Sequence, residues 1–470
     1  MAGFICGIYA ATSGLDNPWS ILPYLLSGAL VTELILWHYK TNIKFLIASA
    51  LIAGFFYSVG YGFLVNQNQT VPVSGAVFQA SGRVAEVRAG LDSQRIFLSL
   101  QPPQNGRLDV LVGKFPELRY GDQVSVKGKI TAIPNEKHSY ALRHQLIGSL
   151  IFPEVLIENR GGGNPVKRKL EEAQQAVKNT LRKILPAEES SFVAGLLLGD
   201  TSGFSKNFRD SIRKAGVSHI VALSGYNITI IIQSVALLLL GIVPRRAVFA
   251  LTILVALGFV IMTGADASIV RAAIMALVVG LASQTEKIYS ARNAIALTGL
   301  VMLLINPYLL LGDIGFQLSF LALIGIFYLA PALRKIFHLG FNSGVWHWRE
   351  NAVNTIAAQA AVFPILAMSF KTISLVSILA NVIILPLIPL TMLLSAATLA
   401  VYVLNSALGQ LLAELLKLVM RAEIKLIDFL SANAGAIQIN ALSEIATVFY
   451  FFALLAIVFY GQKKLTTYES

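Results

Sequence analysis

The chain has 470 residues, of which 56% are hydrophobic and only 13% carry a charge, and its mean hydropathy is +0.68. Soluble domains contain about 25% charged residues, so this composition excludes an ordinary soluble protein and indicates a polytopic membrane protein. The net charge of +12 fits either the positive-inside bias of cytoplasmic loops or a polyanionic partner. A single cysteine, Cys6, excludes an intrachain disulfide and a multi-cysteine metal site.

Two apolar runs open the chain, at about Ile21–Trp37 and Ile43–Val65. Each is long enough to cross about 30 Å of hydrocarbon. Lys40 and Lys44 place the turn between them in the cytoplasm, so the second run ends outside. We expect no cleavable leader, because Met1–Ala11 is apolar but has no basic segment.

Residues 66–160 differ from this pattern, because charges return and short apolar–polar alternations appear, as in Ile96, Leu98 and Leu100. Turn signals separate these alternations, so we expect about five short strands in a small Greek-key barrel of the OB-like kind, outside the cytoplasmic membrane. Basic residues are interleaved with acids, which leaves a solvated barrel and a nucleic-acid surface both open. These basic residues are Arg83, Arg88, Arg95, Arg107, Arg119, Lys127 and Lys129.

A polar hinge, Asn159–Pro165, leads into two helical patterns. The apolar stripe in Val166–Leu185 predicts an amphipathic helix that lies on the membrane surface. A second helix starts after Pro186, and its apolar half, Phe192–Leu198, is too short to span. The expected domains are N-terminal transmembrane helices at 1–65, the barrel at 66–160, amphipathic helices at 161–216, a larger transmembrane domain at 217–464 and a tail at 465–470.

The larger membrane domain holds a series of apolar runs that we interpret as spans. They are Val217–Ile242, Ala247–Thr263, Ala267–Ala282, Ala291–Ile305, Ile314–Leu333, Ala352–Phe370, Ile373–Ile388, Pro389–Leu404 and Ile445–Tyr460. Between them, Asn405–Ser431 predicts an amphipathic helix that is interfacial or packed against a channel rim. If every run spans once, the basic loops fall on one side, which puts the C-terminus in the cytoplasm.

One stretch, Leu196–Asn227, places polar groups and glycines at the mouth of a hydrophobic run. Such groups are costly unless they face water, a partner or a ligand, so the stretch either lines something or packs one helix tightly on another. The basic helix within this stretch either lies at the entrance of a channel or faces solvent or lipid headgroups. The candidates are Gly199, Asp200, Lys206, Arg209, Arg213, His219, Ser224, Gly225, Tyr226 and Asn227.

A hydrolase would need His219 as the base for Ser224, but five residues apart on one helix they point to different faces. We therefore predict no catalytic residue. The chain also carries no metal-binding signature and no phosphate-binding loop, so we predict no metal and no cofactor.

Further polar residues lie inside the expected spans. An ionised side chain at a helix centre costs at least about 2.5–3.5 kcal/mol, so Arg271 needs a partner or a water-filled lumen. Asp313 and Gln317 are four apart and share a helix face, whereas Pro386 and Pro389 must break a helix. Each residue alone fits a structural tie, but together they favour a polar-lined passage. The other members of this set are Asp266, Ser268, Gln359, Lys371 and Asn381.

Several ordered stretches resemble the ComEC family, the inner-membrane DNA channels of bacterial natural competence. They are GRVAEV and GDQVSVKGKI in the barrel, then GLLLGDTSGFSKNFRDSIRKAGVSHIVALSG, ASIVRAAIMAL, NPYLLLGDIGFQLSFLA and SLVSILANVIILPLIPL. The resemblance covers about Gln79 to Pro389. It implies a polytopic helical protein with an inserted OB-like domain that threads one DNA strand into the cytoplasm.

The resemblance also implies partners: single-stranded DNA and membrane lipid, a DNA receptor and a cytoplasmic ATP-driven motor, with a nuclease supplied by a separate polypeptide or not at all. Tyr226 and Asn227 stand where the family has Leu and His, so Asn227 supplies only hydrogen bonds. The metallo-β-lactamase-like domain of many members does not follow Lys464, which predicts a channel-only member. A permease for another polar or anionic solute and a non-transporting scaffold remain alternatives.

Overall fold

The computed structural model describes residues 53–62, 74–90, 92–102, 104–134, 138–221, 224–239, 241–284, 290–337, 348–370, 372–374, 376–434, 436–438 and 444–466. The expected span Ile21–Trp37, most of Ile43–Val65 and the candidate Lys371 lie outside these residues, while residues 53–62 are helical. The chain forms two compact units. One contains residues 1–171 and 287–316, and the other contains residues 172–286 and 317–470.

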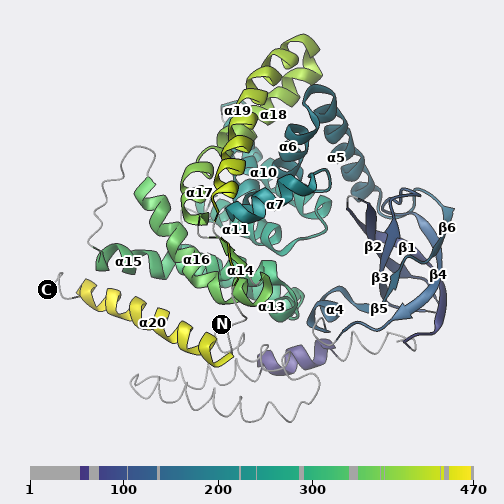
Figure 1. Ribbon diagram of the computed structural model, residues 1–470, viewed down its shortest axis with the longest axis horizontal. Helices are drawn as coiled ribbons and strands as arrows, with labels where there is room; N and C mark the ends of the chain where they lie inside the picture. Colours follow the sequence, from purple (N-terminus) through teal and green to yellow (C-terminus); the bar gives the residue numbers. More distant parts are fainter. Residues whose placement is uncertain are drawn as a thin grey trace. The chain divides into compact units, whose positions relative to one another are not determined.

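Six strands of the first unit form one sheet in the order β1-β2-β3-β5-β4-β6, and an additional β1–β4 pairing closes five of them into a ring (Figure 1). The strands are β1 (Val77–Ala89), β2 (Ser93–Leu100), β3 (Arg107–Gly113), β4 (Gln123–Thr131), β5 (Leu146–Ile151) and β6 (Glu154–Asn159). All pairs are antiparallel except β3 with β5. This confirms the predicted small barrel, with β6 added beside β4.

The alternation in the sequence places every second side chain inside the barrel. Ile96, Leu98 and Val124 are fully buried there, as expected for inward positions of a strand. Helix α4 (His138–His144) covers Phe97, whose ring stacks on that of His144 with centroids 5.2 Å apart. Burial, helped by the nearby cation of Arg143, lowers the pKa of His144 to about 3, so this histidine is a neutral packing residue.

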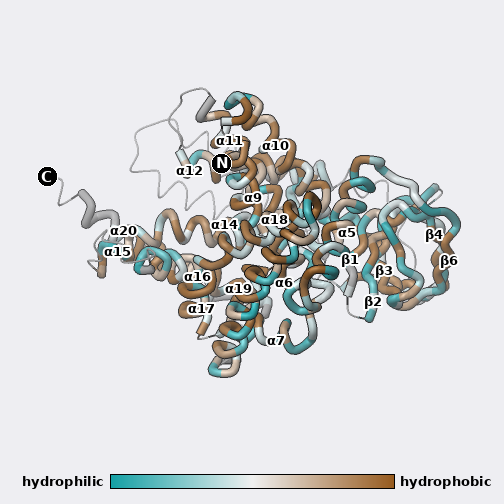
Figure 2. Tube along the Cα trace, turned by 90° about the horizontal axis from the view of Figure 1, so that it is seen from above, coloured by the Kyte–Doolittle hydropathy of each residue, from teal (hydrophilic) through white to brown (hydrophobic). Residues whose placement is uncertain are grey.

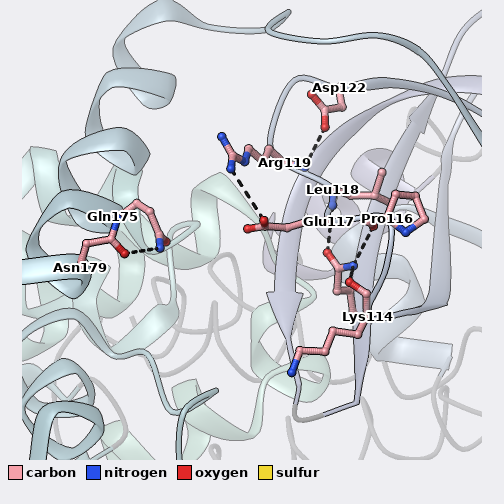
Figure 3. Close-up of polar contacts among 9 residues, drawn as sticks. Lys114, Pro116, Glu117, Leu118, Arg119, Asp122, Gln175 and Asn179 are labelled. Carbon is pink, nitrogen blue, oxygen red and sulfur yellow. Dashed lines mark hydrogen bonds and ion pairs between the residues drawn. The ribbon is translucent and has the colours of Figure 1, made fainter. Parts of the chain in front are cut away.

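A buried glutamine, Gln94, fixes the loop between β3 and β4. Its amide nitrogen donates to the carbonyl oxygens of Lys114 (2.8 Å) and Pro116 (3.1 Å), and its oxygen accepts from Leu118 N (3.1 Å). Farther along the loop, Arg119 N donates to the Asp122 carboxylate at 2.9 Å (Figure 3). These bonds satisfy backbone groups that no strand pairs, and they hold the loop against the barrel.

The remaining elements are mostly helices. They are α5 (Pro165–Ile184), α6 (Ala187–Leu198), α7 (Lys206–Ala215), α8 (Ser218–Val221), α9 (Gly225–Leu239), α10 (Arg245–Met262), α11 (Ala267–Gln284), α12 (Ala291–Ile305), α13 (Leu309–Gly312), α14 (Ile314–Ile324), the π-helix η3 (Gly325–Leu329), α15 (Ala330–Ile336), α16 (Trp348–Phe370), α17 (Ser377–Ile384), α18 (Ile388–Leu404), α19 (Ser406–Ala432) and α20 (Glu444–Thr466), with a short pair of strands, β7 (Thr372–Ser374) and β8 (Ala436–Gln438).

Within the described residues, three helical segments are long and apolar enough to cross a membrane: Arg245–Met262, Ile314–Ile336 and Arg349–Ser369. A fourth is possible if the bent pair α17–α18 forms one span. Colouring by hydropathy shows the apolar character of α10 and of the neighbouring helix α11, in contrast to the mixed barrel strands (Figure 2).

Two of the runs that we expected to be single spans are not continuous helices. The run Val217–Ile242 is divided between α8 and α9, which begins only at Gly225. The run Ile373–Ile388 is a short strand followed by the eight-residue α17, which bends by 46° into α18. The bend follows from Pro386 and Pro389, which cannot continue a helix, and it confirms the predicted break.

Candidate functional site

The turns of the stretch Leu196–Asn227 come from residues with matching backbone preferences. Helix α6 ends where Gly199 adopts a left-handed conformation with φ of 71°, which a glycine reaches without steric cost. Helix α7 starts after Ser205, whose hydroxyl accepts from Phe208 N at 3.1 Å as an N-cap. The polar segment is therefore an ordered turn and a capped helix.

Asp200 in this turn is held by α5. Its carboxylate lies 2.8 Å from the Lys178 ammonium and accepts from Ser202 N at 2.9 Å. Burial opposes the ionisation of Asp200, but Lys178 and the Ser202 donors outweigh it and lower the pKa of Asp200. The pair borders a shallow, partly open pocket, which is lined by Lys178, Arg182, Ser190, Ser191, Ala194, Asp200, Ser202 and Gly203.

Helix α7 presents its cations outward, as its amphipathic pattern predicts. Phe208 and Ile212 are buried, while Lys206, Arg209 and Arg213 are exposed. One guanidinium nitrogen of Arg209 donates to the Thr201 carbonyl at 3.3 Å, and Arg213 lies 3.8 Å from Asp210. Exposed ion pairs of this kind contribute little to stability, so these side chains are available to an anionic partner.

Asn227 is a fully buried tie between three helices. Its amide nitrogen donates to the carbonyl oxygens of Leu196 in α6 (3.3 Å) and Ile220 in α8 (3.2 Å). Its side-chain oxygen accepts from the Ser224 hydroxyl at 3.1 Å. Carbonyls in the last turn of a helix have no partner within that helix, so Asn227 supplies what the ends of α6 and α8 lack.

The helix break separates the pair that a hydrolase would need. His219 is exposed on α8, whereas Ser224 precedes α9 and is bonded to Asn227. Tyr226 is 43% exposed in the first turn of α9, where its ring is accessible.

Gly225, Arg271 and Phe320 bring α9, α11 and α14 together around one guanidinium. A Cβ added at Gly225 would lie 2.6 Å from Arg271 Nη2, so the guanidinium can occupy this position only beside a glycine and would have to move for any other residue. On another side, Arg271 Cζ lies 5.9 Å from the centroid of the Phe320 ring, within the range of a cation–π contact. Each of the three residues belongs to a different stretch of the resemblance.

Arg271 Nη1 is buried and has no hydrogen-bond partner among the residues that the structure describes. A buried charged donor without an acceptor is costly. The planar fork of the guanidinium matches the oxygens of a phosphate or carboxylate. The site can therefore bind an anionic group at Arg271, with an aromatic ring beside it.

Asp266 and Ser268 lie at the start of α11, next to this cluster. The Asp266 carbonyl accepts from Ile269 N and Val270 N at 3.0 Å each, which begins the helix. The Ser268 carbonyl lies 3.5 Å from the position of a Cβ at Gly225. Both residues thus shape the α9–α11 contact through their backbone.

Asp313 belongs to the first unit, where it joins α4 to the turn before α14. Its carboxylate lies 2.5 Å from Arg143 Nη1 and accepts from Phe316 N at 2.9 Å. Asn306 donates to the Arg143 carbonyl at 3.2 Å. Asp313 is therefore a paired and buried anchor for the barrel helix.

The other candidates lie apart from Arg271 in the sequence and have local roles where the structure describes them. Gln359 donates to the Ser377 hydroxyl at 3.2 Å and so links α16 to α17. Asn381 is buried before the α17–α18 bend, and its side-chain oxygen has no hydrogen-bond partner in the described part of the chain. Gln317 lies in the first turn of α14.

Three of the seven barrel cations named above lie beside acidic side chains. Arg95 donates to Asp109 at 2.7 Å, Arg88 lies 2.6 Å from Glu86, and Arg119 lies 3.7 Å from Glu117. Lys127 and Lys129 are exposed on β4. These pairings favour the solvated-barrel interpretation for that part of the surface.

Sequence reasoning missed the partners that complete these sites. Lys178, Arg143 and Phe320 were not among the candidates, although each contacts one. Lys178 and Arg143 lie 22 and 170 residues from their acidic partners, and no periodic signal links positions so far apart. Phe320 follows Gln317 by three residues, so the helix spacing could have placed it near the same face.

Residues 196–464, which begin at the stretch described above, match the family model for "Competence protein". The chain belongs to this family. The chain is also 27% identical over 233 residues to ComE operon protein 3 of Bacillus subtilis (strain 168).

That alignment covers 49% of this chain and 29% of the relative, so it spans less than a third of the relative's length. No solved structure matches the chain. In the described residues, no group of three or more His, Cys, Asp and Glu side chains is placed to hold a metal.

Proposed function

We propose that this competence protein passes a single strand of DNA across the cytoplasmic membrane during natural transformation. The family relationship supports a role in competence. The long apolar helices provide segments that could cross the bilayer. A single strand carries a negative phosphate at each nucleotide, so its passage through hydrocarbon requires a wet path with positive groups.

In this proposal the protein is a multi-pass protein of the bacterial inner membrane. The barrel lies on the extracytoplasmic side and the C-terminus lies in the cytoplasm, as the distribution of basic loops favours. Exposed cations of α7, including Lys206, Arg209 and Arg213, raise the local concentration of DNA at the entrance. A DNA receptor and an ATP-driven motor act with the protein as separate polypeptides.

The observation that carries the proposal is the unpartnered Nη1 of Arg271. A phosphodiester oxygen would complete its hydrogen bonding and neutralise its charge. Gly225 leaves the space for this side chain, and the Phe320 ring stabilises the cation on another side. Because every nucleotide carries the same phosphate, one such contact serves a strand of any sequence.

The proposal is tested by deleting the protein from a transformable host and supplying DNA labelled on one strand. We expect bound label at the cell surface to persist while nuclease-protected cytoplasmic label is lost, and the wild-type chain supplied in trans should restore it. Normal cytoplasmic label in the deletion strain would contradict the proposal.

A further inference from the structure

Helix α19 carries a carboxylate inside an otherwise apolar packing stripe. Its buried positions recur at Ala413, Leu416, Met420, Glu423 and Ile427, which is the three-and-four spacing of a helix face packed on a neighbour. Glu423 is 1% exposed. Charged side chains are almost never buried to this extent unless they are paired, so this position requires an explanation.

The hydrogen bonds around Glu423 suit a neutral carboxyl group. One carboxyl oxygen lies 2.5 Å from the Thr391 hydroxyl oxygen of α18. That hydroxyl also lies 3.2 Å from the Leu387 carbonyl oxygen, and it has only one proton to donate. A protonated Glu423 completes a chain in which Glu423 donates to Thr391 and Thr391 donates to Leu387.

An ionised Glu423 would be poorly compensated. Its second oxygen is buried without a hydrogen-bond partner, and in the described part of the chain no ion pair to it is found, because Arg421 pairs with Glu189 (3.2 Å) and Lys417 with Glu414 (2.6 Å). An unpaired buried charge costs several kcal/mol, on the order of the whole stability margin of a domain.

The helices packed on α19 also provide no ion-pair partner for Glu423 in the described part of the chain. Helices α17 and α18 contain no Asp, Glu, Lys, Arg or His. Helix α7 buries Phe208 and Ile212 and turns its charged residues outward. The ionisable groups on the packed elements and on α19 itself are Glu188 and Glu189 of α6; Lys206, Arg209, Asp210, Arg213 and Lys214 of α7; Tyr402 of α18; and Glu414, Lys417, Arg421, Lys425 and Asp428 of α19.

We propose that Glu423 is a proton-binding site of the competence region, neutral while α18 and α19 are packed and able to release its proton to water only when they separate. Burial raises the pKa of Glu423 to about 7, and the hydrogen bond that the Thr391 hydroxyl can donate to the ionised carboxylate offsets this only in part. Helix α19 is not among the segments that qualify as spans. With a pKa of about 7, the Glu423 carboxyl group gains and loses its proton near neutral pH.

The protonation of Glu423 is coupled through these hydrogen bonds to the bend between α17 and α18. Leu387 stands between α17 and α18, at the 46° bend, so the chain from Glu423 through Thr391 ends at the break. Loss of the proton favours a conformation in which the Glu423 side chain reaches water, and this loosens α19 from α18 beside the bend. This proposal goes beyond DNA passage and does not depend on it.

The test is a pH titration of the full-length protein in lipid nanodiscs, followed by infrared spectroscopy of the carboxyl stretch. We expect a protonated carboxyl band that disappears with a midpoint near pH 7, is absent in Glu423→Gln and persists in Glu414→Gln, a variant of an exposed acid on the same helix. Thr391→Val should retain the band but shift its frequency, because the hydrogen bond is lost.

A second measurement covers the case in which Glu423→Gln folds poorly. A carboxyl whose pKa is raised in the folded state destabilises that state as pH rises from the unfolded value of about 4.3 toward 7. The thermal midpoint of the wild-type and Glu414→Gln proteins should therefore fall across this window by more than that of Glu423→Gln. A wild-type protein with no titrating carboxyl band, or a band that survives in Glu423→Gln, overturns the proposal.

Discussion

Asp313 and Arg271 are both charged residues of the competence region with buried polar atoms, but their surroundings differ. Asp313 has a cation at 2.5 Å and a backbone N–H at 2.9 Å. Arg271 has a glycine and an aromatic ring for neighbours, and its Nη1 has no acceptor among the described residues. The first is an internal anchor, and the second is a donor that still needs an acceptor.

This difference divides the polar residues of the apolar sequence into two groups, according to whether their polar atoms have partners within the described protein. Asp200, Asn227 and Gln359 belong with Asp313, because each makes hydrogen bonds or ion pairs that hold helices or turns together. Arg271 differs from them, because its Nη1 atom is buried and has no acceptor among the described residues. Removing an anchor should reduce stability first, whereas removing Arg271 should reduce function in a folded protein.

The largest effect is expected from breaking the anchor. Asp313→Leu leaves Arg143 buried without its partner, which costs about 3–5 kcal/mol. We expect a lower thermal midpoint of the purified protein and less protein in the membrane. Adding Arg143→Met should recover much of the loss, since a buried ion pair can be replaced by apolar groups of similar volume. No recovery in the double variant would mean that the two residues act separately.

A smaller effect is expected when Arg271 is displaced and the residue itself is kept. Gly225→Ala places a Cβ 2.6 Å from Nη2, and the flexible end of the arginine can move away. Losing one charge-assisted hydrogen bond in the passage costs about 1.5–3 kcal/mol, so we expect about a tenfold or larger decrease in DNA uptake with normal protein levels. Gly60→Ala is the matched control, because its Cβ meets no atom within 4 Å.

Asp200→Asn should have a modest effect that depends on pH. The pair with Lys178 is mostly shielded from solvent, and we expect its loss to cost about 1 kcal/mol after screening. Because folding lowers the pKa of Asp200, its contribution is present above the unfolded pKa of about 3.9 and is lost as pH falls through the folded value. Thermal unfolding at pH 7 and in acid should show the difference between wild type and variant narrowing in acid.

The smallest effect is expected at Phe320. Phe320→Leu keeps an apolar side chain but removes the ring, and a partly desolvated cation–π contact contributes about 1 kcal/mol. Uptake should fall by a few-fold, and Phe320→Tyr should retain most of the activity. Equal uptake by all three proteins would show that the ring contributes only packing volume.

Much of the fold could be predicted because its signals are local. The alternation through Ile96 and Leu98 gave the barrel, and the stripe in Val166–Leu185 gave α5. The break before Gly225 was missed because Val217–Ile242 was treated as one apolar run despite Ser224 and Gly225 within it, and hydrophobicity alone does not distinguish one helix from two. At Pro386 the missing N–H made the break predictable.

The candidate site was less predictable because its contacts are distant in sequence. Arg271 could be singled out by the cost of a charge in an apolar run, but its approach to Gly225 depends on how α9 and α11 pack. Asp313 carried the same signal of polarity in an apolar region, yet its partner Arg143 lies in the barrel domain. The polarity of these residues in apolar sequence thus identified both positions. Only their contacts in the structure showed that Asp313 is paired and that Arg271 has a donor without an acceptor among the described residues.

The central claim is that Arg271 contacts the DNA strand. The most direct measurement compares nuclease-protected cytoplasmic DNA in cells expressing wild type, Arg271→Leu or Arg271→Lys, with surface-bound DNA and membrane-inserted protein measured in parallel. We predict loss of uptake in Arg271→Leu, partial uptake in Arg271→Lys, and unchanged insertion and surface binding in both. Wild-type uptake in Arg271→Leu would contradict the account.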